Sequence, residues 1–214
     1  MRTLAFDGQT GASGDMILAA LVAAGGDPDV LAPVEDALGV EYRIGETTSN
    51  GIHATTVDVR FDSGADESHG TGSNHDSPRH DHEDDHSHDH THNHDDHTHS
   101  HDDHGHDHAE GSGPNRTYAE CRDIVAEMGL PSSVETDAIA IFRLLGEAEA
   151  RVHGTDLEET HFHEVGADDA IADIVGSALL LADLDVDRVV TTSVAAGGGE
   201  VSMSHGVYPV PAPA

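Results

Sequence analysis

The sequence predicts an α/β protein of the α+β kind: a small mixed-sheet unit with flanking helices, interrupted by a disordered His-rich insertion. Short β-branched runs and helical periodicity occur at both ends of the chain, which favours an α/β core. Between them, residues 69–108 contain no residue of the apolar set AVILMFWYC. Such a segment has no hydrophobic gain to offset its conformational entropy, so we expect it to be disordered without metal.

We therefore expect three segments. Residues 1–62 form an N-terminal α/β unit with a glycine-rich turn, residues 63–116 form a His/Asp-rich metal-binding insertion, and residues 117–214 form a helical and α/β part. The last segment ends in a proline-rich run with nothing after it to pack against, so we expect the chain to be cut off mid-structure or to be the first half of a split protein.

The first segment begins with a predicted strand over 3–7, a glycine-rich turn, and a buried helix over 16–24 that Gly25 and Gly26 end. A second short helix is expected over 28–38. The β-branched runs 40–47 and 52–62 flank an Asn-Gly pair, which is typical of a β-hairpin turn.

The last segment begins with Thr117 and Glu120 in a capping-box pattern, which predicts a helix over 117–128. Helices are expected over 131–152 and 168–184, a strand over 189–194, and an extended segment from 197 to the end. The apolar stripe of the first of these helices comprises Ala138, Ile141, Phe142, Leu145, Ala148 and Val152. On the second, Asp169, Asp173 and Gly176 lie opposite the apolar stripe; we interpret them as a solvated face, with a cleft wall as the alternative.

The composition is strongly acidic, with 42 acidic and nine basic residues and a net charge of −33; all nine basic residues are Arg. The acidity is global, because the His-rich tract over 69–108 carries only eleven of the acids. A lysine-free acidic surface suits a high-salt cytoplasm, so we expect a halophilic, cytoplasmic protein. Such a surface would repel nucleic acid. The sequence has no apolar run of membrane-spanning length and one cysteine, Cys121, which excludes a disulfide framework.

The tract over 69–108 holds fifteen of the twenty histidines. Imidazole is a ligand for nickel, zinc, copper and iron, and the interleaved aspartates add oxygen donors. An expression tag or a pH-responsive linker is the alternative interpretation, and composition alone does not distinguish nickel from zinc. The candidate metal ligands are His86, His88, His90, His92, His94, His97, His99, His101, His104, His106 and His108.

Two further motifs suggest chemistry. The turn carrying Gly8, Gly11, Ser13 and Gly14 has amides that could cradle an anion at a helix N-terminus, although it is neither a Walker loop nor a dinucleotide fingerprint. The alternative is a tight turn in which Asp15 is favoured by the helix dipole.

The second motif is His161-Phe-His163-Glu164. In an extended segment its two histidines point the same way, as in a paired metal ligand or an acid/base pair. Buried structural histidines are the alternative interpretation.

These motifs, in this order, resemble the LarC family of nickel-insertion proteins, which mature the nickel-pincer cofactor of lactate racemase. The matching segments are Phe6-Asp7 with Gly11-Ala-Ser-Gly-Asp-Met16, the His-rich insertion, His161-Phe-His-Glu-Val-Gly-Ala167 with 169–176, and His205-Gly with Pro209-Val-Pro-Ala-Pro-Ala214. They span nearly the whole chain.

The resemblance implies a nickel chelatase that inserts Ni²⁺, its substrate metal, into pyridinium-3,5-bisthiocarboxylic acid mononucleotide. The family's reaction consumes CTP with Mg²⁺ or Mn²⁺, which the resemblance places in a C-terminal half that follows residue 214. It implies that His161, His163 and Glu164 hold nickel or accept the ring proton, with Asp15 as a further catalytic candidate, and that the turn over 8–14 receives the substrate phosphate.

Two non-enzymatic functions remain open. The chain could be a nickel store or chaperone that delivers metal to a partner, or it could buffer zinc or copper without an organic substrate. All of these functions predict metal binding by the tract, and they differ in whether product is formed.

Overall fold

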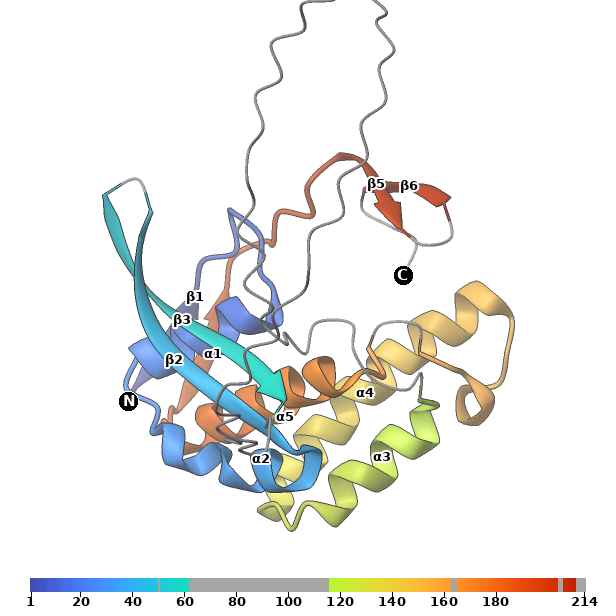
Figure 1. The fold of residues 1–214 in the computed structure, drawn as a ribbon, viewed down its shortest axis with the longest axis horizontal. Helices are drawn as coiled ribbons and strands as arrows, with labels where there is room; N and C mark the ends of the chain where they lie inside the picture. The colour runs from blue at the N-terminus through green and yellow to red at the C-terminus, as the bar shows by residue number, and fades with distance from the viewer. Residues whose placement is uncertain (50, 62–115, 163–164, 204–205, 211–214) are drawn as a thin grey trace, which may run out of the picture. The chain divides into compact units, whose positions relative to one another are not determined.

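The computed structural model describes residues 1–49, 51–61, 116–162, 165–203 and 206–210 (Figure 1). The predicted disorder of the insertion lies outside these residues. The α/β class is confirmed, since helices and small sheets form a mixed α/β unit (Figure 1). Parallel and antiparallel pairing both occur, in separate two-stranded sheets within the described ranges.

The two ends of the chain meet in a parallel pair of strands. β1 (Thr3–Phe6) pairs with β4 (Arg188–Thr191), with Thr3 opposite Arg188 and Phe6 opposite Thr191. β1 leads through the glycine-rich turn into α1 (Gly14–Ala23), and α5 (Asp168–Asp183) precedes β4. α1 and α5 pack against each other, so the turn and the start of α5 become neighbours.

The second predicted helix begins as a short 3-10 turn, η1 (Pro28–Leu31), before α2 (Ala32–Leu38). Pro33 has no N–H to donate back to the preceding turn, so the α-helix starts afresh at Ala32. The predicted hairpin is confirmed as β2 (Val40–Ser49) and β3 (Ile52–Phe61), and Gly51 has the positive φ of 79° that its turn requires. Figure 1 shows the turn end of this hairpin projecting away from the helices.

Beyond the insertion lie α3 (Tyr118–Glu127), α4 (Ser132–His153) and a short 3-10 turn, η2 (Leu157–Glu159). The predicted capping box is present, with both Thr117–Glu120 hydrogen bonds formed. The predicted extended C-terminal segment instead contains a hairpin, β5 (Gly199–Met203) and β6 (Gly206–Val210). Among the described residues, no helix is both long and apolar enough to cross a bilayer.

One hydrophobic core joins the residues before the insertion to those after it. Leu18 of α1 and Val34 of α2 share it with Val175 of α5 and Phe142 of α4, all fully buried. Phe142 lies against Phe162, with ring centroids 6.3 Å apart. α5 is the central helix, since it contacts α1, α2, α4 and β3.

The structure corrects two helix-face predictions. On α4 only part of the predicted stripe is covered: Ala138 and Phe142 are buried, whereas Ile141, Leu145 and Val152 are exposed. On α5 the face predicted to be solvated is instead the alternative cleft wall: Asp169 and Asp173 are half-buried and line a cavity. Gly176 is buried and lies so close to the Tyr42 hydroxyl that a Cβ there would be 2.7 Å from it. A helix covered on several sides needs small residues where its neighbours approach closely, and Gly176 is such a residue.

Candidate functional site

The glycine-rich turn is fixed by hydrogen bonds to its own backbone and to the segment after β4. The amide of Gly11 donates to the carbonyl of Gly8 over 3.0 Å, and that of Ala195 donates to the same oxygen over 2.8 Å. The amide of Gly8 donates to the Thr192 hydroxyl over 2.9 Å. Gly11 has a φ of 96°, which favours glycine. Two amides predicted to cradle an anion, those of Gly8 and Gly11, therefore already have protein acceptors.

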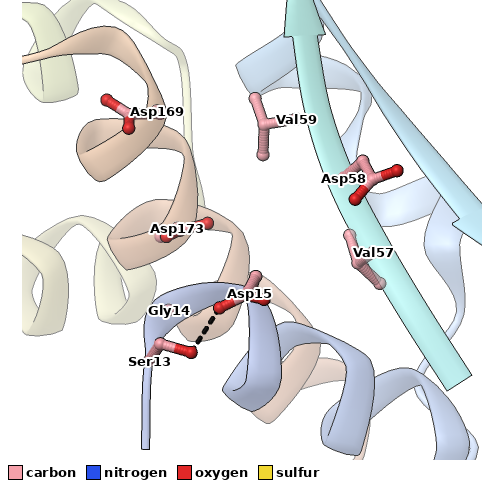
Figure 2. Close-up of a pocket in the computed structure, with 8 residues that line it drawn as sticks. All are labelled: Ser13, Gly14, Asp15, Val57, Asp58, Val59, Asp169 and Asp173. Atoms are coloured by element: carbon pink, nitrogen blue, oxygen red, sulfur yellow. Dashed lines mark hydrogen bonds between the residues drawn. The ribbon is translucent and has the colours of Figure 1, made fainter. Parts of the chain in front are cut away.

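The other half of the turn opens onto a small cavity of about 220 Å³ (Figure 2). Three elements form its wall: the start of α1, the middle of β3 and the first two turns of α5. Its lining comprises Ser13, Gly14, Asp15, Val57, Asp58, Val59, Asp169 and Asp173. The cavity therefore joins predicted residues of the turn to carboxylates that lie far along the chain.

Gly14 is the point of closest contact in this cavity. A Cβ at Gly14 would overlap the carboxylate of Asp173 and would lie 2.7 Å from the Asp173 Cβ. Only a glycine lets α5 approach the start of α1 this closely. The Asp173 carboxylate thus occupies the end of α1 where the helix dipole favours negative charge, the place at which the sequence suggested a bound anion.

The cavity is negatively charged. Asp15, Asp58, Asp169 and Asp173 all line it, and none of the described lining residues is an Arg. Arg60 lies beside one of them, with its Nη2 3.4 Å from the Asp58 carboxylate. Within the described ranges no three His, Cys, Asp or Glu side chains are placed to hold a metal ion together. The arrangement suits a hydrated divalent cation bound through water, and it disfavours a bare phosphate.

The HFHEVGA motif is attached to the start of α3. The amide of Phe162 donates to the carbonyl of Arg116 over 2.9 Å, and that of Tyr118 donates to the carbonyl of Thr160 over 3.0 Å. Phe162 is buried, while the side chain of His161 is exposed. His163 and Glu164 lie outside the described residues, as do the tract histidines 86–108.

Arg116 connects this motif to α5. Its Nη2 lies 2.6 Å from the Asp168 carboxylate, and its Nη1 donates to the carbonyl of Gly166 over 2.8 Å. Asp168 is buried, and the next residue, Asp169, lines the acidic cavity. His161 itself does not line the cavity, but the motif that carries it leads directly into the cavity wall.

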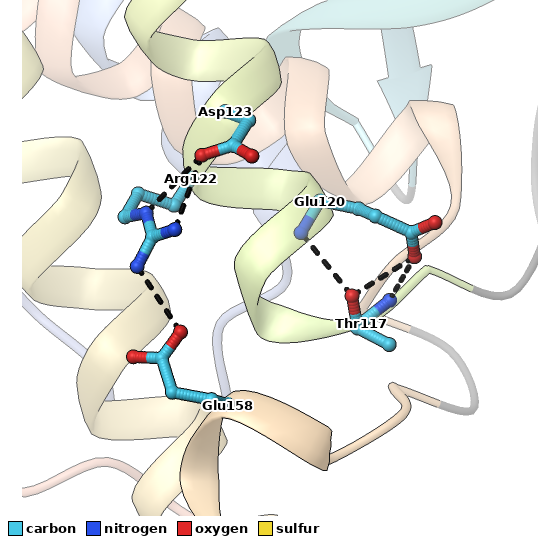
Figure 3. Close-up of polar contacts among 5 residues, drawn as sticks. All are labelled: Thr117, Glu120, Arg122, Asp123 and Glu158. Atoms are coloured by element: carbon cyan, nitrogen blue, oxygen red, sulfur yellow. Dashed lines mark hydrogen bonds and ion pairs between the residues drawn. The ribbon is translucent and has the colours of Figure 1, made fainter.

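The capping box of α3 lies beside His161. Glu120 accepts from the Thr117 amide over 2.7 Å, and the Glu120 amide donates to the Thr117 hydroxyl over 3.2 Å (Figure 3). These bonds hold the pKa of Glu120 below its ordinary value, and the nearby His161 and Arg116 act in the same direction. Arg122 joins α3 to η2 through Glu158, over 3.1 Å (Figure 3).

Two further ionisable side chains are buried in the fold. Burial raises the pKa of Cys121 to about 11, so this cysteine is a neutral thiol at physiological pH and a poor metal ligand. Burial, Asp173 and Glu35 raise the pKa of Tyr42 well above its ordinary value. The Tyr42 hydroxyl donates to the carbonyl of Ala172 over 2.6 Å, which fixes α5 beside the cavity.

The structure places only some of the predicted residues in this cavity. Asp15, Ser13 and Gly14 do line the cavity, whereas Gly8 and Gly11 face a second, apolar groove on the other side of the turn. Asp169 and Asp173 were noted only as an alternative cleft wall. Asp58 was missed, because an aspartate in a β-hairpin of an acidic protein carries no distinguishing signal.

The sequence model of the family described as Nickel insertion protein matches residues 4–214. A putative nickel insertion protein of Methanococcoides burtonii is 35% identical over 215 residues, which cover 100% of this chain and 42% of the relative. The pyridinium-3,5-bisthiocarboxylic acid mononucleotide nickel insertion protein of Akkermansia muciniphila is 38% identical over 218 residues, covering 100% and 44%. A further putative nickel insertion protein, of Methanosarcina barkeri, is 54% identical over 100 residues, covering 46% and 25%.

The chain thus spans less than half the length of these curated relatives. No solved structure matches it. Since the family match runs through the glycine-rich turn, the HFHEVGA motif and the wall of the acidic cavity alike, the chain belongs to the nickel insertion protein family.

Proposed function

We propose that this chain takes part in inserting nickel into pyridinium-3,5-bisthiocarboxylic acid mononucleotide. The family match over residues 4–214 carries this proposal, because relatives in Akkermansia muciniphila and Staphylococcus saprophyticus are named for that insertion. Those relatives are more than twice as long as the matched part, so we infer that the complete reaction also uses a C-terminal half. Lactate racemase is the proposed client of the finished cofactor.

Nickel supply is the role we propose for the tract. Its histidines at 86–108 offer many imidazoles at short spacing, which can form several alternative ligand sets for Ni²⁺. The tract would then collect Ni²⁺ and supply it to the rest of the protein. The acidic, lysine-free composition supports a location in a salt-rich cytoplasm.

The chemical step needs a base as well as a metal site. When nickel bonds to the ring carbon, the proton that leaves this carbon must be accepted by a nearby group. We infer that His161, His163 or Glu164 accepts it or holds the ion, since neutral imidazole serves both purposes. Asp15 and the neighbouring carboxylates of the cavity would hold a hydrated cation close to the start of α5.

The substrate phosphate could bind at fewer positions of the glycine-rich turn than the sequence predicts. Gly8 and Gly11 already use their amides, and the cavity beside Ser13 and Gly14 has four carboxylates. We infer that the phosphate enters this part of the turn only together with a divalent cation. The described lining of this cavity offers no Arg and the chain has no Lys, which disfavours the triphosphate of CTP here. We propose that CTP binds with Mg²⁺ or Mn²⁺ in the C-terminal half.

The test is a turnover assay. The purified chain is incubated with Ni²⁺, CTP, Mg²⁺ and the thiolated mononucleotide, with and without the unmatched half of the Akkermansia muciniphila relative, and nickel-bound product is measured by mass spectrometry. We expect product with the second half present. Nickel binding without product in either mixture would contradict the proposal and leave metal storage.

Two variants refine this assay. Combining His161→Ala with His163→Ala should abolish product, while His53→Ala with His153→Ala, two exposed histidines outside the motif, should not. Undiminished product in the first variant would remove the role given to the motif.

Deleting residues 69–108 should lower the amount of product at limiting nickel and leave it unchanged at saturating nickel. Loss of product under both conditions would contradict the proposed role of the tract in nickel supply.

A further inference from the structure

A second cavity, distinct from the acidic one, lies on the other side of the glycine-rich turn. It is a groove of about 710 Å³ between β1, β4 and the helices α1, α4 and α5. In a chain with a net charge of −33, its only charged lining residues are Asp7 and Asp137. The rest of its wall consists mainly of Ala, Ile, Leu, Met, Phe and Val side chains. A wall of this kind is unusual on so acidic a protein.

Several large side chains of this groove are exposed, although Leu21 is buried and Phe6 is half-buried. Leu144 is 68% exposed, Val194 57% and Met16 48%. The apolar surface continues along α4 beyond the groove, to Leu145 and Val152. Spacings of three, four and eight residues place these α4 side chains on one helix face. Leu145 and Val152 belong to the predicted apolar stripe, whereas Leu144 lies beside it, and the described residues leave all three exposed.

The sheet at the base of the groove is also incomplete. β1 and β4 form a two-stranded parallel sheet, and Phe6 and Val189, one from each strand, lie in the groove wall. Parallel strands normally have both faces covered, and isolated two-stranded sheets are marginally stable. Val189 is nevertheless 44% exposed. Among the residues that the structure describes, both α4 and this sheet therefore lack cover on the side of the groove.

We propose that the groove and the adjoining face of α4 are the docking surface for a polypeptide, namely the part of nickel insertion proteins that lies beyond the length this chain matches. In the Methanococcoides burtonii and Akkermansia muciniphila relatives the matched part is 42% and 44% of the protein, so more than half of each polypeptide remains to pack. A small molecule would fill the groove and leave Leu145 and Val152 exposed. A second copy of this chain would bring together two surfaces of high negative charge.

The test uses the whole chain and the unmatched half of the Akkermansia muciniphila relative. The two are joined by a flexible linker, which raises their effective concentration to about millimolar, and are also mixed as separate proteins. Hydrogen exchange of residues 137–152 and sedimentation report docking. No nickel or nucleotide is added, so failure here is distinguishable from failure of the turnover assay.

We expect slower exchange of α4 in the linked protein and a complex in the mixture. Leu144→Glu should weaken that complex by about ten- to hundred-fold, because it places a charge where an apolar side chain would be buried. Ile52→Glu is the matched control, since Ile52 is 71% exposed on the distant hairpin, and it should leave binding unchanged. Both variants alone should unfold like the wild type, because both side chains are exposed.

Unchanged exchange of α4 in the linked protein would overturn the proposal. So would a complex that Leu144→Glu does not weaken, because docking would then use another surface. If the chain alone forms a dimer that Leu144→Glu abolishes, the groove is an interface between two copies and the proposed occupant is wrong.

Discussion

The two cavities beside the glycine-rich turn differ in charge and in how completely they are packed. Ser13, Gly14 and Asp15 face the acidic cavity, where Gly14 lies against Asp173 without room for a methyl group. Gly8 and Met16 face the apolar groove, in which Met16, Leu144 and Val194 are exposed. One short turn thus separates a close contact between α1 and α5 from a surface that no described residue covers.

Different parts of α5 line the two cavities. Asp169 and Asp173, in its first two turns, line the acidic cavity, while Ala178 and Leu181, further along, line the groove. The helix is thus shared by a polar site and a docking surface. A partner bound in the groove would contact the helix that carries two of the cavity's four carboxylates, Asp169 and Asp173.

The largest expected effect is on the free energy of unfolding, and it differs between the buried and the exposed face of α4. Phe142→Ala should lower the free energy of unfolding by about 3–5 kcal/mol, because Phe142 is fully buried against Phe162 and its loss leaves a cavity. Leu144→Ala, two residues away, should change it by less than about 0.5 kcal/mol, since that side chain already faces solvent. Chemical denaturation measures both. Equal losses for the two variants would show that the groove side is packed in solution.

Gly14→Ala tests the fitted contact between α1 and α5. The added methyl group would collide with the Asp173 side chain, and the displacement should cost about 1–3 kcal/mol of unfolding free energy. Gly198→Ala is the control, because a Cβ there meets nothing within 4 Å. Thermal and chemical denaturation report the difference. A neutral Gly14→Ala would mean that the cavity wall is looser than the structure shows.

Local signals allowed most helices and the hairpin to be predicted. The capping box at Thr117 and Glu120 and the positive φ of Gly51 depend on neighbours within a few residues, so they are visible in the sequence. The pairing of β1 with β4 joins opposite ends of the chain, and no local pattern specifies it. The uncovered face of α4 was predicted as core for a related reason: periodicity shows which face is apolar but not what covers it.

The candidate site could likewise be predicted only where its residues belong to a local sequence motif. Ser13, Gly14 and Asp15 belong to a motif and were identified, whereas Asp58 reaches the cavity only because the β2–β3 hairpin packs beside α1. Asp173 was noted on its helix face, but its position at the start of α1 depends on the α1–α5 contact. His163 and Glu164 lie outside the described residues, so their roles stay predictions.

The smallest effect concerns Tyr42, which connects the hairpin to α5 behind the acidic cavity. Tyr42→Phe removes the hydrogen bond to the Ala172 carbonyl and should cost about 1 kcal/mol near neutral pH. Burial and then Asp173 raise the Tyr42 pKa above its ordinary value of 10.0, so the folded state favours the neutral phenol. The stability that this shift contributes is therefore complete below pH 10 and is lost as the pH rises above that value.

Urea denaturation between about pH 8 and pH 11 checks this dependence. The wild type and the control variant Tyr118→Phe should lose stability at the alkaline end, and Tyr42→Phe should lose less, because it has no phenol to ionise at this position. As the pH rises, the difference between the wild type and Tyr42→Phe should narrow. A constant difference would contradict this prediction, because it would mean that the pKa of Tyr42 is the same in the folded and unfolded states.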